Sequence, residues 1–176
     1  MVMRTLEALL RGIDWFIDWS GQGFKWLGLV FVLTISYDVA MRYVFGMPTK
    51  WSYELSYMVG GSMMVLAGAF VMLHDEHVKI DIIYNRLSLR KQLIIDISLC
   101  LLFFFPMVAI LTKFSFDRAV QAWATGELSN LSYWHPPLAP FRTVVFLGFC
   151  LLSVEGVAWF TRKLIHFIKL TTGKGL

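Results

Sequence analysis

The chain has 176 residues, of which 57% are hydrophobic and only 16% are charged. Soluble domains carry about 25% charged residues, so this composition excludes an ordinary soluble domain and indicates a membrane protein. The net charge is +4, and the basic residues lie between apolar segments instead of forming one basic face, which argues against a nucleic-acid-binding protein. Cys100 and Cys150 each lie in an apolar segment without a CxxC neighbour, so we expect buried thiols that carry no redox or metal chemistry.

Residues 1–22 have the pattern of an amphipathic helix. Charged residues recur every three or four positions and form one helical stripe: Arg4, Glu7, Arg11, Asp14 and Asp18. The charges also interrupt any apolar core of a cleavable signal peptide, so none is expected. We predict a helix that lies in the membrane interface and ends where Gly21 and Gly23 let the chain turn into the membrane.

Four apolar segments are each long enough to cross a bilayer, which takes about 20 residues. They cover residues 24–45, 51–73, 92–112 and 138–160, within a membrane domain of residues 23–161. We therefore predict an all-α integral membrane fold with four transmembrane helices and the N-terminal amphipathic helix. Pro106 predicts a kink in the third span, and the prolines and glycine before the fourth span predict irregular backbone there.

The spans contain ionisable residues that lipid alone does not tolerate. Asp38 and Arg42 are four positions apart, so we expect them to pair on one helix face. Glu54, Asp96 and Glu155 lie near the ends of predicted spans. The preferred interpretation is that they hold helices together or anchor span ends; a proton relay, contact with a partner subunit and a gating role are the alternatives.

The distribution of lysine and arginine predicts the orientation. Eleven of these residues lie at the N-terminus, in the connector after the second span and in the basic tail 162–176, against five on the other side. The positive-inside rule then places both termini in the cytoplasm.

Histidines give little support for a metal or haem site. His74 and His77 are three positions apart and form a conceivable metal site, although a solvated span end is the simpler interpretation. All four histidines lie at or beyond span ends, which disfavours a haem-binding helix bundle. No hydrolase, metalloprotease or P-loop motif occurs, so we expect neither an enzyme nor a bound cofactor.

Two stretches around the second span resemble a known family. Residues 42–54 have the sequence RYVFGMPTKWSYE and residues 77–81 the sequence HVKID. Their order and spacing resemble the small membrane subunit of TRAP transporters, the DctQ-type family, which are tripartite, ATP-independent uptake systems of bacteria and archaea. The resemblance extends over the whole chain, with one departure: Glu76 stands where a glycine often precedes the histidine of the second motif.

The resemblance implies a non-catalytic subunit of a sodium-coupled importer of an organic acid, in the bacterial cytoplasmic (inner) membrane. In such a system a periplasmic binding protein captures the solute, and a large elevator-type membrane subunit binds the solute and sodium. The small subunit would be a scaffold for the large one and would help to dock the binding protein. The expected partners are these two proteins and membrane lipids, with no nucleic acid; no cofactor is expected in this chain.

Three groups of residues carry the expected contacts. The residues expected to fix the first two spans to each other or to the large subunit are Asp38, Arg42, Tyr43, Trp51 and Glu54. Those expected to order the cytoplasmic end of the second span are His77, Lys79 and Asp81, and those expected to meet the binding protein are Trp134 and His135. Two other functions stay open: a membrane redox subunit of cytochrome or quinone type, and a small transporter that works alone as a homodimer.

Overall fold

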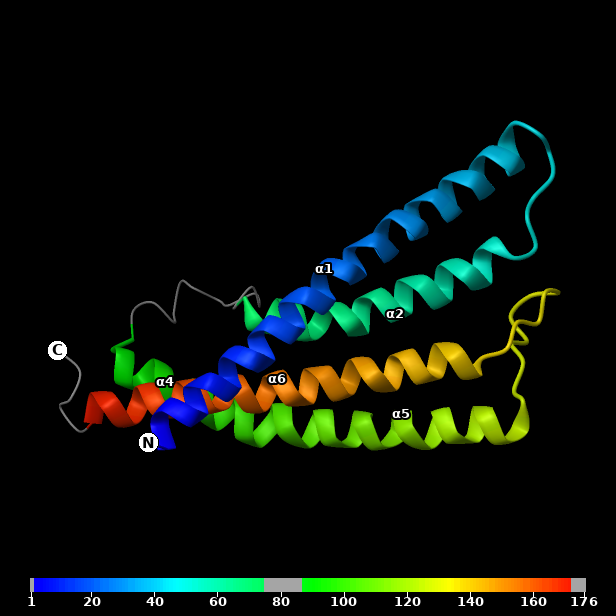
Figure 1. Cartoon of the computed structure of the whole chain (residues 1–176). Coiled ribbons are helices and arrows are strands. Elements are labelled where there is room, and N and C mark those ends of the chain that lie inside the picture. The colour runs from blue at the N-terminus through cyan, green and yellow to red at the C-terminus, as the bar shows by residue number, and fades with distance from the viewer. Residues whose placement is uncertain (1, 75–86, 172–176) are drawn as a thin grey trace.

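The computed structural model describes residues 2–74 and 87–171 and is built from helices (Figure 1). In chain order the elements are α1 (Val2–Tyr43), α2 (Ser52–Leu73), α4 (Leu89–Leu99), the π-helical turn η1 (Cys100–Phe104), α5 (Phe105–Thr125) and α6 (Ala139–Thr171). The stretches long and apolar enough to cross a membrane are Leu10–Tyr43, Ser52–Leu73, Leu89–Thr125 and Ala139–Ile168. The predicted all-α fold with four apolar spans is therefore confirmed.

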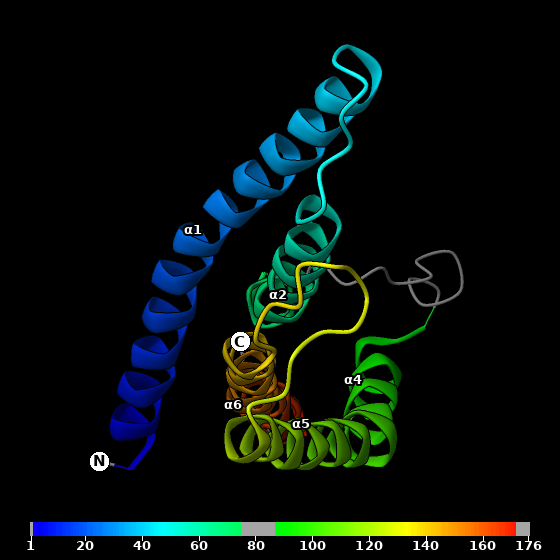
Figure 2. The same cartoon turned by 90° about the vertical axis from the view of Figure 1, so that its right-hand side faces the viewer.

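The helices α2 and α6 form the centre of the bundle and run in the same direction (Figure 1). α1 packs on α2, and α5 packs on α6, so α1 and α5 lie at opposite edges (Figure 2). The α1–α2 and α5–α6 connectors lie at one end of the bundle, here named the connector end (Figure 1). The described ends of the chain lie at the other, here named the terminal end.

A glycine sets the close approach of the two central helices. A Cβ at Gly148 of α6 would lie 2.7 Å from Val65 Cγ1 and 3.1 Å from the Val65 carbonyl carbon of α2. Small residues at such contacts let membrane helices approach and gain van der Waals contact, which drives their association where water is absent. The close approach of α2 and α6 therefore depends on glycine, which has no side chain, at position 148.

The helix α1 differs from the expected pair of an interfacial helix and a separate span. It is continuous from Val2 to Tyr43 and passes through Gly21 and Gly23 without a break. Each glycine costs about 1 kcal/mol relative to alanine in a helix, which does not by itself end one. Gly21 instead faces the Phe70 ring of α2, where a Cβ would overlap the ring, so this glycine provides close packing and not a turn.

The third span bends where Pro106 predicts it. The backbone N–H of Phe105 donates to the carbonyl of Cys100, five residues earlier, which widens the helix into the turn η1. Pro106 has no N–H, and its ring would press against the carbonyl four residues before it in a regular helix. The wider turn relieves this contact, and α4 leaves the line of α5 in Figure 2, so the predicted kink is confirmed.

Both of the last two spans are longer than predicted from hydropathy. The helix that contains α5 continues to Thr125 and ends at Gly126, which has a left-handed conformation (φ +61°). Residues 126–138 then form the predicted irregular connector, here named the outer loop, with one isolated bridge between Leu128 and Pro137. α6 continues to Thr171, so the first residues of the expected basic tail are helical.

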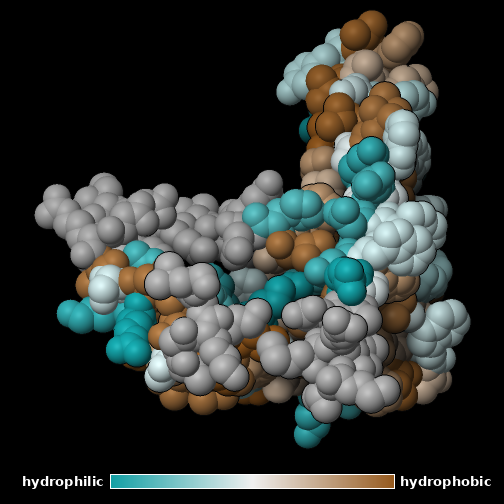
Figure 3. Space-filling model, turned by 60° about the vertical axis from the view of Figure 1, so that its left-hand side comes forward, coloured by the Kyte–Doolittle hydropathy of each residue, from teal (hydrophilic) through white to brown (hydrophobic). Residues whose placement is uncertain are grey.

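Much of the apolar surface is uncovered. In Leu10–Tyr43 only 6% of the most apolar 18-residue stretch is buried within the chain, and in Ser52–Leu73 the share is 22%. Figure 3 shows hydrophobic side chains over the raised end of α1, with hydrophilic side chains gathered towards the terminal end. Lipid or another protein must cover these faces, because apolar surface of this extent is not left in water.

Candidate interaction site at the two ends of the bundle

Asp38 joins the end of α1 to the connector that precedes α2. Arg42 Nη2 donates to Asp38 Oδ2 at 2.8 Å, which confirms the predicted pair. Thr49 donates to Asp38 Oδ1 from its backbone N–H at 3.2 Å, and also from its hydroxyl. Hydrogen bonds to a charged acceptor are stronger than neutral ones, so this carboxylate fixes the path of the connector.

Trp51, the residue before α2, adds an aromatic contact to α1. Its ring stacks on Tyr37 of α1, with 5.7 Å between the ring centroids and 26° between the planes. Tyr43, at the end of α1, is 79% exposed. The two aromatic residues of the motif therefore have different surroundings: Trp51 packs within the chain, and Tyr43 is available to a neighbour.

Glu54 lies in the first turn of α2 and is completely buried. The hydroxyls of Ser129 and Ser132, the backbone N–H of Ser132 and the His135 ring face its carboxylate. None of these contacts has the full geometry of a hydrogen bond to either carboxylate oxygen within the described residues. The start of a helix is favourable for a negative charge, and Glu54 places that charge beneath the outer loop.

The outer loop is held by its own hydrogen bonds and by α6. Ser129 N–H donates to the Pro136 carbonyl at 2.9 Å, and the His135 Nδ1 lies 2.7 Å from the Ser129 carbonyl oxygen. Arg142 of α6 pairs with Glu127 at 2.5 Å. His135 has a positive φ of 47°, a conformation that costs a non-glycine residue energy and is kept only when its surroundings fix it.

The predicted docking residues of the outer loop have separate positions. Trp134 is 48% exposed and its neighbour Tyr133 is 90% exposed, so both present aromatic surface beyond the bundle. His135 instead turns its ring towards Ser129 and Glu54. The structure thus brings His135 and Glu54 together, although the sequence assigned them to different contacts.

The motif after the second span is outside the described residues. His77, Lys79 and Asp81 all fall in 75–86, so their ordering role stays a prediction. His74 is described, and its Nε2 lies 3.5 Å from Asp18 Oδ1 of α1. Among the described residues, no group of three or more His, Cys, Asp or Glu side chains is placed to hold a metal ion.

A cluster of ion pairs at the terminal end was only partly foreseen. Arg162 of α6 pairs with the buried Glu155 on its own helix and, at 2.5 Å, with Asp14 of α1. Lys163 lies 3.2 Å from Asp96 of α4. The preferred interpretation of Asp96 and Glu155 as helix-bracing residues agrees with this geometry. The sequence analysis did not predict Arg162 and Lys163 as the partners of these carboxylates, because it placed both in the basic tail.

Comparison with known proteins identifies the family. Residues 31–165 match the family model described as "Tripartite ATP-independent periplasmic transporters, DctQ component". A comparison with curated proteins gave no match. The matched region contains the Asp38 contacts, Glu54 and the outer loop, and it extends over most of the chain. This chain therefore belongs to the DctQ family, the small membrane component of TRAP transporters.

Proposed function

We propose that the chain is the fixed scaffold of a sodium-coupled importer of an organic acid. As a DctQ component it is part of a transporter and not an enzyme, and it is a multi-pass protein of the inner membrane. The observation that carries the proposal is the contrast between fastened ends and uncovered sides. Polar contacts hold α1 to the connector before α2 at one end and α6 to α1 and α4 at the other, while the apolar faces between the two ends are left for a larger partner to cover.

A scaffold has to resist movement while a transport domain crosses the bilayer. The Asp38 contacts and the Trp51–Tyr37 stack hold the end of α1 to the connector just before α2. The Arg162 and Lys163 pairs hold α6 to α1 and α4 at the terminal end. Among the predicted residues, Tyr43 and Arg42 are exposed and suit direct contact with the large subunit; Asp38 and Trp51 act through the position of α1.

The outer loop is the proposed docking surface for the periplasmic binding protein. Tyr133 and Trp134 expose aromatic rings, and large amphipathic rings are common energetic centres of protein interfaces. Glu54 of α2 and His135 of the loop face each other on the side of the loop that packs on the bundle. Solute and sodium are proposed to bind the large subunit, so this chain determines assembly and not selectivity.

Uptake into proteoliposomes tests the proposal. Three preparations would contain this chain, the co-encoded large membrane subunit, or both, with the co-encoded binding protein outside. The solute would be chosen by screening dicarboxylates, 2-oxo acids and sugar acids for binding to that protein. We expect uptake only with both membrane chains and an inward sodium gradient, and no uptake when choline replaces sodium.

Two results would contradict this function. Uptake by this chain alone would move the solute path into its own four spans. Equal uptake by the large subunit alone would show that the scaffold is dispensable.

A further inference from the structure

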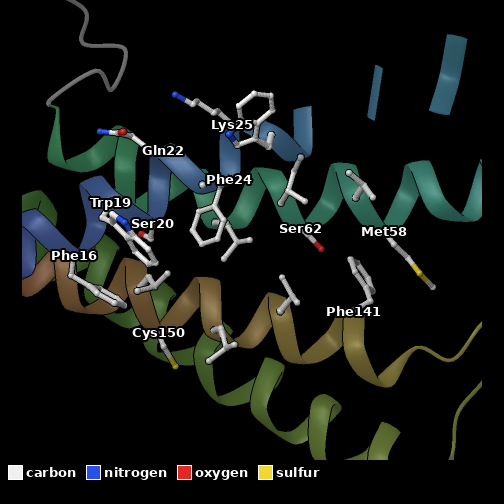
Figure 4. A pocket seen from close by; sticks show the side chains of 18 of the residues that line it. Phe16, Trp19, Ser20, Gln22, Phe24, Lys25, Met58, Ser62, Phe141 and Cys150 are labelled. Carbon is white, nitrogen blue, oxygen red and sulfur yellow. The ribbon is translucent and has the colours of Figure 1, made fainter. Parts of the chain in front are cut away.

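A long apolar groove lies between α1, α2 and α6 (Figure 4). It has a volume of about 1160 Å³ and runs from Phe16 and Trp19 at one end to Met58 and Phe141 at the other. Pockets for drug-sized ligands have roughly 300–1,000 Å³, so this groove suits something longer. Its α6 wall, lined between positions 140 and 154, is about 21 Å long at 1.5 Å per residue.

Polar groups gather on the α1 side of the groove. Ser20, Gln22 and Lys25 line it there, next to Trp19 and Trp26. Figure 4 shows the polar ends of Gln22 and Lys25 directed away from the apolar floor. Within the described part of the chain, the Lys25 ammonium has no ion-pair or hydrogen-bond partner. A cation between two tryptophans is typical of the level of lipid headgroups.

The neighbouring contacts fix the depth of Lys25. Gly21, one turn before it, faces Phe70 of α2, and Gly28, one turn after it, faces Met63. Lys25 therefore lies about 10 Å from the end of α2, counted at 1.5 Å per residue. The flexible side chain of a lysine at this depth reaches towards the headgroup layer, at the terminal end of the bundle.

We propose that this groove holds one phospholipid, with an acyl chain along its apolar walls and the phosphate beside Lys25 and Gln22. The positive charge of Lys25 at the rim of the groove favours a lipid over a transmembrane helix of a partner as the occupant. A helix is about 10 Å wide with its side chains, and seated here it would cover Lys25 and bury the ammonium unless it supplied an acid. A phospholipid places its phosphate in the headgroup layer, which the Lys25 side chain reaches, and leaves the charge hydrated.

The purified complex with its large subunit, in a mild detergent, can be tested by native mass spectrometry. We expect one retained phospholipid per copy in the wild type, in Lys25→Arg and in the control Lys113→Met, which removes an exposed lysine of α5. Lys25→Met should lower the occupancy about fivefold, as expected for one lost lysine–headgroup attraction. Leu147→Trp, at a half-exposed groove position, should also lower it by filling the space.

A photo-crosslinking residue at Met58, within the groove, provides the second measurement. A lipid adduct is expected, whereas an adduct with the large subunit would overturn the proposal and place a helix there. Equal lipid occupancy in Lys25→Met, Leu147→Trp and the wild type would overturn it as well. Because both readouts concern bound lipid and not uptake, the proposal stands or falls separately from the transport function.

Discussion

Glu54 and Glu155 are both completely buried carboxylates, yet their neighbours give them different tasks. Glu155 pairs with the guanidinium of Arg162, so its charge is balanced by an opposite charge. Glu54 faces hydroxyls, an N–H and an imidazole ring of the outer loop. The first carboxylate therefore contributes to the stability of the bundle, and the second to the order of one loop.

Replacing Glu54 should loosen the outer loop without unfolding the helices. In Glu54→Ala, the backbone amides of Ser129 and Leu131 should exchange with deuterium faster than in the wild type. Glu54→Gln, which keeps the shape and one acceptor, should be intermediate. The matched control is Asp117→Asn, an exposed carboxylate of α5. Unchanged exchange in Glu54→Ala would show that the loop is ordered by its own hydrogen bonds alone.

Removing Arg162 should be more damaging than removing its partner Asp14. Breaking a buried ion pair costs about 3–5 kcal/mol because it leaves a charge uncompensated, so Arg162→Met should unfold at a markedly lower denaturant concentration. Asp14→Asn should cost less than about 1 kcal/mol, because Asp14 is 35% exposed. The double variant Glu155→Gln/Arg162→Met should recover much of the lost stability; additive losses would contradict the pairing.

The sequence predicts local pairs and misses distant ones. Asp38 and Arg42 are one helical turn apart, so their pairing follows from helix geometry alone. Glu54 meets Ser129 and His135 only because two connectors lie at the same end of the bundle. That meeting depends on which helices are neighbours, which no spacing in the sequence specifies.

At the scale of elements, α2 was predicted almost to the residue and α1 was not. The expected span 51–73 corresponds to α2 (Ser52–Leu73), where Pro48 before the helix and His74 after it mark clear limits. Gly21 and Gly23 have no such single meaning, because glycine suits both a turn and a close helix contact. In the structure Gly21 is in close contact with the Phe70 ring. The sequence alone does not show this, because Phe70 is remote from Gly21 along the chain.

Glycine contacts give a direct test of helix packing. Gly148→Ala should destabilise the chain by about 1–3 kcal/mol, the usual cost of an overpacked core, because the new methyl group meets Val65. Gly12→Ala is the matched control, since a Cβ there has no atom within 4 Å. It should be neutral, or stabilising by up to about 1 kcal/mol through helix propensity. Equal thermal midpoints for the two variants would contradict the close approach of α2 and α6.

At the scale of the whole molecule, the chain is an open layer of helices with its polar contacts at the two ends. The charge count predicts that the terminal end faces the cytoplasm. In a background with Cys100 and Cys150 replaced by alanine, an impermeant maleimide should label Asn130→Cys in intact spheroplasts. Thr171→Cys should react only after the membrane is opened. The reverse pattern would invert the protein and remove the outer loop from reach of the binding protein.

The central place of α6 also has a consequence for how the protein is made. α6 is the last helix of the described chain and contacts α1, α2, α4 and α5. During synthesis, α2 therefore enters the membrane with α1 beside it but well before α6 exists, so that the face of α2 around Val65 has only lipid beside it. The bundle closes in one late step, when α6 brings Gly148 and Arg162 into place. A chain whose synthesis stops before residue 139 would lack both Gly148 and Arg162. A membrane protease can recognise such an open chain as unfinished.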